Sequence, residues 1–280
     1  MNPYIALIRP GNAILTAIAV IAGAFIAKGP EDILDFQTEI AICCISAMML
    51  VSGGNALNDY NDRESDKKNH PERPIPYGKI SANNALNFAQ SLLGLGLVIL
   101  LLTLDNKMPF IIALLGVLTL LAYENGLKAA GITGNIAVGF MSGAVFLFAG
   151  MAVNDPGLTL WMFGLALLAT ISREIVKDIQ DLEGDQDRKT LPARIGIENA
   201  LNLAAVILII AIGLSYTATN QFENMALNAY LGGVTLANGM MFYGIYNAKY
   251  ENYEIGQKNI KQGMGIAMLA FIVAAGLQIY

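Results

Sequence analysis

The stretch NALNDYNDRESD, residues 55–66, interrupts a long apolar run with a group of acidic and amide side chains. Asn58, Asp62 and Asp66 recur at every fourth position. Asp59 lies three residues before Asp62, so a helix would place all four side chains on one wide face. Oxygen ligands without histidine or cysteine suit a hard cation such as Mg²⁺ better than zinc. The stretch therefore indicates a magnesium site or, in the simpler interpretation, a solvated helix end.

A second copy of this pattern, 119 residues further along, favours the metal site. It lies in REIVKDIQDLEGDQD, residues 173–187, and the tripeptide Asn-Ala-Leu follows each copy, at 84–86 and 199–201. Four positions in register with the same flank indicate an internal repeat. In the order Asn55, Asp59, Asp62 and Asp66, the equivalent residues are Glu174, Asp178, Asp181 and Asp185.

The composition is that of a membrane protein. Of the 280 residues, 55% are hydrophobic and only 14% are charged, and the mean hydropathy is +0.52. Charged residues are confined to short stretches between apolar runs, which is unusual for a soluble domain. The sequence also lacks a nucleophile elbow, a P-loop and a dinucleotide-binding fingerprint. These features argue against the common soluble enzyme classes and predict a polytopic membrane protein.

Nine apolar runs are long enough to cross a bilayer, which takes about 20 residues. The chain is therefore predicted to be an all-α membrane protein with nine transmembrane helices in a single domain. Because the motifs end the second and sixth helices, each repeat has four helices, and both repeats share one orientation around a central cavity. The repeats span about 1–133 and 134–262, followed by a ninth helix at 263–280. The nine runs are 12–28, 38–57, 84–104, 108–123, 134–153, 158–176, 199–217, 225–246 and 263–280.

The basic residues predict the orientation in the membrane. Fifteen of the 17 Lys and Arg residues fall on one side of the nine-helix arrangement, and only Lys28 and Lys107 fall on the other. Cytoplasmic loops carry an excess of these residues. The N-terminus, both motifs and the mouth of the cavity are therefore expected at the cytoplasmic face of the cell membrane, with the C-terminus outside.

Acidic side chains at membrane depth are costly, about 2.5–3.5 kcal/mol each on insertion scales, so a cluster of them usually faces a cavity or a partner. Two acidic faces are expected to hold Mg²⁺, which in turn would hold a diphosphate. The predicted metal ligands are the oxygen-bearing residues of the two motifs: Asn58, Asp59, Asp62, Asp66, Glu174, Asp178, Asp181 and Asp185.

Cations near the motifs suit phosphate oxygens. Each one alone is more typical of a topology signal, but as a ring around the carboxylates they favour substrate binding. Tyr123 and Lys128, in LAYENGLK at the inner end of the fourth helix, add a phenol and an ammonium at the same level. The proline-rich loop HPERPIPYGK, 70–79, is predicted to be an extended lid over the cavity mouth or a plain connector. The candidate phosphate-binding residues are Arg63, Lys67, Arg73, Lys128 and Lys177.

The motifs together resemble the UbiA superfamily of intramembrane prenyltransferases. The similar segments are Asn58-Asp59-x-x-Asp62-x-x-x-Asp66, Asp178-x-x-Asp181-x-x-x-Asp185, Arg9-Pro10-x-Asn12 and Arg73-Pro74-Ile75-Pro76. The resemblance implies that Mg²⁺ held by the motifs binds the diphosphate of an isoprenyl donor, which ionises to an allylic cation in a water-free cavity. It also implies substrate contact by Asn12 and stabilisation of the cation by Tyr123. The residues that it implies as catalytic are Asp62, Asp66, Asp178, Asp185, Tyr123 and Lys128.

Within that family, the segments KDIQDLEGD and YENGLK look most like archaeal enzymes of ether-lipid biosynthesis. Those relatives move a geranylgeranyl group from geranylgeranyl diphosphate to the free hydroxyl of geranylgeranylglyceryl phosphate. A phosphate on the acceptor would give a use to further cations such as Lys67, Arg188 and Lys189. The expected partners are therefore the isoprenyl diphosphate, the lipid acceptor and membrane lipids, without nucleic acid, whereas the oligomeric state is not predicted.

Two alternatives remain open at this point. The first is an aromatic or tetrapyrrole acceptor, as in quinone, haem or chlorophyll-type relatives. The second and more distant one is a cation or metabolite carrier, which also uses repeats and intramembrane carboxylates. Transporter sites usually lie near the midplane of the bilayer, whereas both motifs here fall at inner helix ends.

Overall fold

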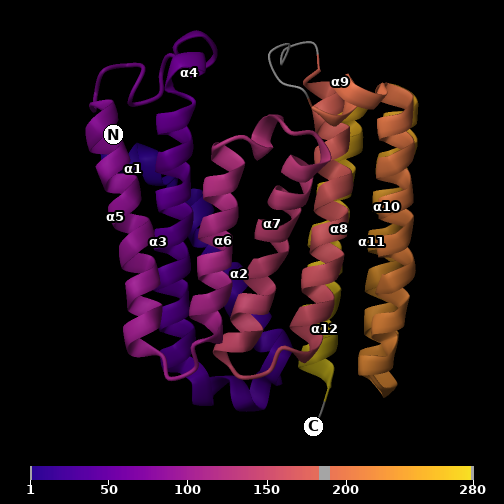
Figure 1. Cartoon of the computed structure of the whole chain (residues 1–280). Coiled ribbons are helices and arrows are strands. Elements are labelled where there is room, and N and C mark those ends of the chain that lie inside the picture. The colour runs from indigo at the N-terminus through magenta and orange to yellow at the C-terminus, as the bar shows by residue number, and fades with distance from the viewer. Residues whose placement is uncertain (1, 183–189, 279–280) are drawn as a thin grey trace.

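The computed structural model describes residues 2–182 and 190–278. Within these ranges the chain is all-helical and contains no β-strand. Figure 1 shows the long helices side by side in one bundle, with the N-terminus near one end and the C-terminus at the other. The all-helical prediction is confirmed.

Nine helices of 17 to 26 residues form the bundle in the described part of the chain, and each overlaps one predicted apolar run. The largest difference is at the last helix, which begins at Tyr253, before the predicted start at 263. The helix extends beyond the apolar run because polar side chains do not end a helix by themselves. The added segment also packs closely on the preceding long helix, since a Cβ at Gly256 would lie 2.8 Å from the carbonyl oxygen of Gly244. The nine helices are α2 (Pro10–Asp32), α3 (Gln37–Asn61), α5 (Ala82–Thr103), α6 (Met108–Glu124), α7 (Ile132–Ala152), α8 (Gly157–Gln180), α10 (Ile197–Thr217), α11 (Asn224–Lys249) and α12 (Tyr253–Leu277).

Short helices connect the long ones. The sequence did not predict them, because each has eight residues or fewer and carries no membrane-length apolar run. Figure 1 shows α4 and α9 at the same end of the bundle, where α3 and α8 also end. Within the described ranges they are α1 (Pro3–Ile8), α4 (Arg63–Asn69), α9 (Leu191–Ile195) and the 3₁₀ turns η1 (Ile33–Phe36), η2 (Leu127–Ala129) and η3 (Ala218–Gln221).

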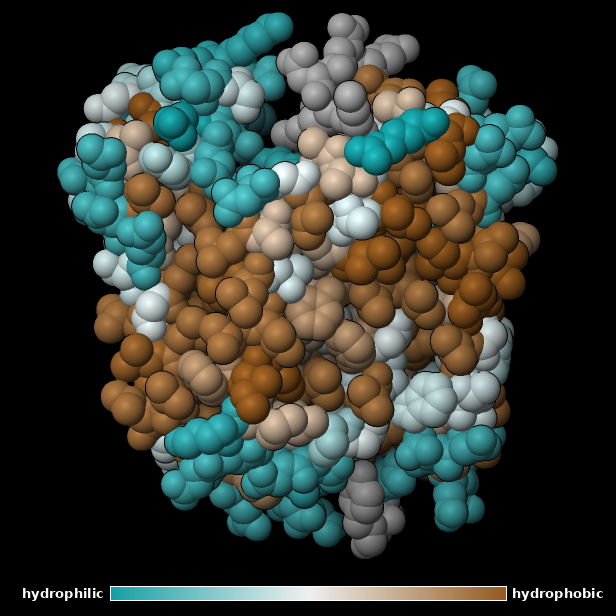
Figure 2. Space-filling view, in the orientation of Figure 1, coloured by the Kyte–Doolittle hydropathy of each residue, from teal (hydrophilic) through white to brown (hydrophobic). Residues whose placement is uncertain are grey.

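An apolar belt surrounds the bundle. Figure 2 shows hydrophobic residues across the middle of the visible face and hydrophilic residues gathered at both ends. Large apolar side chains such as Leu102, 75% exposed, face outward where lipid would cover them. The protein is therefore a multi-pass membrane protein. Six described stretches are long and apolar enough to cross a bilayer, and the first holds both α2 and α3: Pro10–Asn61, Ala82–Thr103, Ile132–Ala152, Gly157–Gln180, Ile197–Gln221 and Tyr253–Leu277.

Helix α7 contacts both motif-bearing helices, α3 and α8, and also α2 and α6. Small residues allow its close approach to α8. A Cβ at Gly139 would lie 2.8 Å from the carbonyl oxygen of Leu167, and one at Gly143 would lie 2.6 Å from that of Phe163. This pair is the small-residue packing that is common between membrane helices. As a result, α7 stands between the two helices that carry the acidic motifs.

Candidate active site

A cavity of about 720 Å³ lies between α2, α3, α5, α6 and α7. Its wall is mostly apolar, with side chains such as Leu50, Leu93 and Phe148. A cavity of this kind, with a few convergent polar groups, is the usual form of a small-molecule site. Most of its polar residues belong to helix ends at the motif end of the bundle, and the full set is Asn12, Thr16, Asn55, Asn58, Tyr123, Glu124 and Ser142.

The first motif is divided between two helices. Helix α3 ends at Asn61, and Asp62 caps it with φ −83° and ψ 2°, so Asp66 belongs to α4. The prediction that one helix carries all four side chains is therefore wrong. The Arg63 guanidinium stabilises the break, because it donates to the Tyr60 carbonyl at 2.7 Å and lies over the Tyr60 ring.

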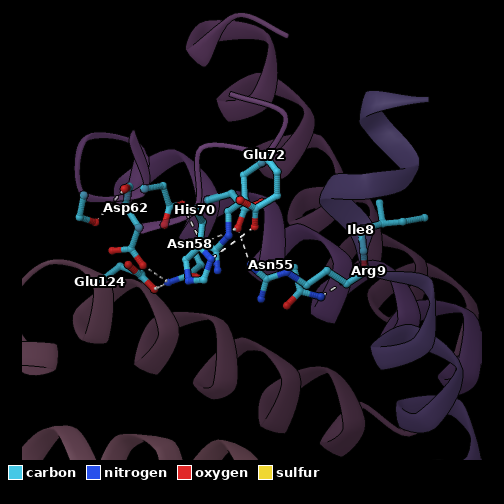
Figure 3. A network of polar contacts seen from close by, with 12 residues as sticks. Ile8, Arg9, Asn55, Asn58, Asp62, His70, Glu72 and Glu124 are labelled. Atoms are coloured by element: carbon cyan, nitrogen blue, oxygen red, sulfur yellow. Dashed lines mark hydrogen bonds and ion pairs between the residues drawn. The ribbon is translucent and has the colours of Figure 1, made fainter. Parts of the chain in front are cut away.

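One part of the first motif lies next to the cavity, where Asn58 and Glu124 line the wall and Asp62 contacts Asn58. The Lys128 Nζ lies 2.7 Å from both carboxylate oxygens of Asp62. The amide nitrogen of Asn58 donates to Asp62 Oδ2 at 3.1 Å and to Glu124 Oε1 at 3.0 Å, and Figure 3 shows these three side chains pointing toward one another. The structure thus brings together Asn58, Asp62 and Lys128, three of the predicted site residues.

The other part of the first motif is buried away from the cavity. Asp59 and Asp66 are only 3% and 4% exposed. Arg9 pairs with Asp59, and Arg73 Nη1 lies 2.7 Å from Asp66 Oδ2 and 3.5 Å from Asp59 Oδ1. A buried carboxylate without such a partner would be strongly unfavourable. Among the described residues, none of the first-motif aspartates lines the cavity, but Asp62 is hydrogen-bonded to Asn58, which does.

The proline-rich loop folds into turns instead of an extended lid. The backbone N–H of Gly78 donates to the Ile75 carbonyl at 3.0 Å, as in a β-turn, and that of Tyr77 donates to the Arg73 carbonyl at 3.0 Å. The extended conformation was wrong because proline excludes a regular helix but favours β-turns as readily as extended chain. Ile75 and Ile80 pack with Leu7 and Leu57, which fixes Arg73 beside the buried carboxylates.

Glu174 and Asp178 of the second motif lie on α8, which packs against α7, and Asp181 caps that helix. Asn135 of α7 donates to Asp178 Oδ2 at 3.1 Å, Arg173 pairs with Glu174, and Lys177 lies 4.0 Å from Asp181. The described cavity-lining residues come from α2, α3, α5, α6 and α7, so a cavity shared by both motifs is not confirmed. The predicted residues Asp185 and Arg188 lie outside the described residues.

The remaining predicted substrate contacts fall into two groups. Asn12 and Tyr123 line the cavity. Arg63 is engaged with Tyr60, and exposed Lys67 pairs with Glu64 at 2.7 Å, so neither reaches toward the cavity in this arrangement.

The donor set fits a hard divalent cation by its chemistry. Carboxylate and amide oxygens such as those of Asn58, Asp62, Asp178 and Asp181 are the ligands that Mg²⁺ prefers. Among the described residues, however, no group of three or more histidine, cysteine, aspartate or glutamate side chains is close enough to hold a metal ion. Binding one would therefore require these side chains to exchange their present cationic or amide partners.

Sequence reasoning missed two residues of the site, Glu124 and Asn135. Glu124 lines the cavity and accepts hydrogen bonds from Asn58 and Asn61, and Asn135 holds Asp178. Each is a polar residue at the end of an apolar helix, and that position is the feature of the sequence from which a site residue could have been predicted. Polar residues at helix ends are also ordinary, so the sequence alone does not separate these two from the others.

The chain belongs to the UbiA prenyltransferase family, whose match covers residues 16–273. The similar proteins include the digeranylgeranylglyceryl phosphate synthase of Methanothrix thermoacetophila, which is 37% identical over 95% of this chain and 97% of that protein. The synthase of the same name from Methanobrevibacter smithii is 35% identical over 98% of each chain.

Solved structures agree with this assignment. One that concerns digeranylgeranylglyceryl phosphate synthase in membranes has a TM-score of 0.85 and 33% identity, and the match covers 99% of this chain and 98% of the other. A UbiA homologue from Archaeoglobus fulgidus bound to GPP and Mg²⁺ has a TM-score of 0.71 over 98% of both chains. Because that homologue is only 17% identical, it supports the fold alone.

The buried pairs of the first motif predict a large effect on stability. Arg73→Ala removes the cation beside Asp66, so the free energy of unfolding is expected to fall by about 3 kcal/mol, as for other broken buried pairs. The measurement is the chemical unfolding midpoint of the purified protein in detergent. Lys68→Ala, at an exposed position of α4, is the control and should leave the midpoint unchanged. An unchanged midpoint for Arg73→Ala would contradict the structural role of this pair.

Proposed function

We propose that this protein transfers a geranylgeranyl group from geranylgeranyl diphosphate to the free hydroxyl of geranylgeranylglyceryl phosphate, in archaeal ether-lipid biosynthesis. The observation that carries the proposal is the apolar cavity of about 720 Å³ with Asn58 at its polar rim, hydrogen-bonded to Asp62. An apolar interior suits an isoprenyl chain, and a charged rim suits its diphosphate. The product of this reaction is the compound in the names of the similar proteins.

The metal requirement is part of the proposal. We assign the first-motif ligands to Asn58, which lines the cavity, and to Asp62 beside it. We assign the second-motif ligands to Glu174, Asp178, Asp181 and Asp185. Asp59 and Asp66 are assigned mainly a structural role, since each is buried and paired with an arginine that joins neighbouring segments. When bound, Mg²⁺ would supply positive charge to the leaving diphosphate.

The chain's own residues would supply the rest of the reaction. Lys128 is placed to bind phosphate oxygens, because its ammonium lies at the rim beside Asp62. The carbon–oxygen bond to the diphosphate breaks with both electrons leaving on the diphosphate. The acceptor oxygen forms the new ether bond, and its hydroxyl proton passes to the released diphosphate. Apolar walls such as Leu120 and Phe148 would exclude water from the allylic cation, and the ring of Tyr123 in the same cavity would stabilise it.

We further infer a single domain of nine membrane crossings made from two four-helix repeats, with its N-terminus and cavity mouth cytoplasmic in the cell membrane. The two termini at opposite ends of the bundle support an odd number of crossings (Figure 1). Equivalent contacts support the repeat. A Cβ at Gly53 would lie 3.0 Å from the Ala89 carbonyl oxygen, and Ser172 at the equivalent position donates to the Ala204 carbonyl at 2.9 Å.

The proposed reaction predicts a specific product. Purified protein in lipid nanodiscs with labelled geranylgeranyl diphosphate, Mg²⁺ and geranylgeranylglyceryl phosphate should form a labelled diether lipid, and chelation of Mg²⁺ should abolish it. Parallel incubations with an aromatic acid and a tetrapyrrole test the other acceptor classes. Product formed only with one of those acceptors would overturn the glycerolipid assignment.

The metal assignment predicts a loss of turnover at the rim. Asp62→Asn and Asp178→Asn should each lower kcat by about 10²-fold or more, because a preorganised electrostatic contact to the leaving group would be lost. Asp105→Asn, an exposed position between α5 and α6 at the opposite end of the bundle, is the matched control. Near-normal kcat in both motif variants at saturating Mg²⁺ would exclude these ligands.

The orientation predicts a labelling pattern. In a background with Cys43→Ala and Cys44→Ala, Lys107→Cys should react with a membrane-impermeant maleimide in intact cells. Lys79→Cys should react only after the membrane is opened, because that loop lies at the motif end. The reverse pattern would show the opposite orientation.

A further inference from the structure

Glu124 is a carboxylate in the cavity that the proposed metal and phosphate contacts do not use. It is the last residue of α6, and it lines the cavity next to Tyr123. A negative side chain is unfavourable at a helix C-terminus, where the helix dipole is also negative. Local helix preference therefore does not account for a glutamate at this position.

The hydrogen-bond partners of Glu124 distinguish it from the aspartates of the first motif. Asn58 donates to its Oε1 at 3.0 Å, and Asn61 donates to its Oε2 at 3.2 Å. Both partners are neutral amides, whereas Asp59, Asp62 and Asp66 each pair with a cation. Two amides fix the plane of the Glu124 carboxylate and leave lone pairs on both oxygens for a further donor.

The position of Glu124 limits what that donor is. An anionic carboxylate repels the phosphates of both substrates, so it suits a cation or a neutral hydrogen-bond donor. Because Mg²⁺ is assigned to Asn58, Asp62 and the second motif, a neutral donor such as a hydroxyl group is left for Glu124. The Asn58 nitrogen contacts Asp62 and Glu124 at once, at 3.1 and 3.0 Å. A hydroxyl bound to Glu124 would therefore lie near the rim where the donor diphosphate is proposed to sit.

We propose that Glu124 is the acceptor-binding residue that receives the hydrogen bond of the free hydroxyl of the prenyl acceptor, with Asn58 and Asn61 holding its carboxylate in place. This inference rests on the proposed function and adds to it the residue that recognises the hydroxyl. The hydroxyl is thereby oriented with its oxygen directed to the reacting carbon of the donor.

The test measures binding of two acceptors that differ only in the hydroxyl: geranylgeranylglyceryl phosphate and its deoxy analogue. Glu124→Ala should weaken binding of the hydroxyl acceptor about tenfold, the worth of one hydrogen bond to a charged group. The dissociation constants of the deoxy analogue and of geranylgeranyl diphosphate with Mg²⁺ should change less than about twofold. Neither ligand makes the hydrogen bond that the substitution removes. Glu124→Gln keeps the side-chain size and serves if the alanine variant does not fold. Asn125→Ala is the matched control, because that amide donates to the backbone carbonyl of Leu121.

Three results would overturn the inference. Equal weakening of both acceptors would indicate a structural role, and a parallel fall in donor affinity would indicate a metal or diphosphate contact. Unchanged binding of all ligands would show that Glu124 does not contact the hydroxyl. Failure of the proposed function is distinguishable, because the unaltered protein would then neither form the diether product nor bind the hydroxyl acceptor more tightly than its deoxy analogue.

Discussion

Negative charge at the edge of an apolar bundle must be neutralised, and this requirement organises the motif end of the molecule. Asp59 and Asp66 are buried and would destabilise the fold if Arg9 and Arg73 did not pair with them. Those two pairs join the segment between α1 and α2, the end of α3, α4 and the proline-rich loop. The loop is therefore compact because it delivers one guanidinium to two carboxylates, and the cavity keeps its shape because these elements are held together.

The same requirement separates carboxylates by role. Asp62 at the rim pairs with Lys128, and its side chain is 21% exposed, so its partner can be exchanged for a ligand at modest cost. Asp59 and Asp66 have no comparable access to the cavity. The three aspartates of the first motif are thus unequal, although their spacing makes them look alike. Chemistry at the rim depends on a carboxylate whose cationic partner can be exchanged for a ligand. The packing of the helix ends depends on carboxylates that stay buried with their arginines.

Close helix packing places this rim beside an apolar space. Gly139 and Gly143 allow α7 to lie against the backbone of α8, and α7 in turn forms one wall of the cavity. Small residues are needed because lipid offers little hydrophobic drive for helix association, so contact area decides it. The resulting cavity combines a wall for a hydrocarbon chain with a rim for its polar end, which is the combination that prenyl transfer requires.

The sequence by itself determined the membrane class, the all-helical fold and the family. Apolar runs and the spacing of the acidic motifs are local patterns that persist whatever the helices contact. Only the tertiary structure decided that α3 stops at Asn61, that Lys128 meets Asp62, and that Glu124 turns to Asn58. These outcomes depend on which helix ends meet in space, and two residues that are far apart in the chain carry no local signal of their pairing. A carboxylate acquires its role from the charge that folding places beside it.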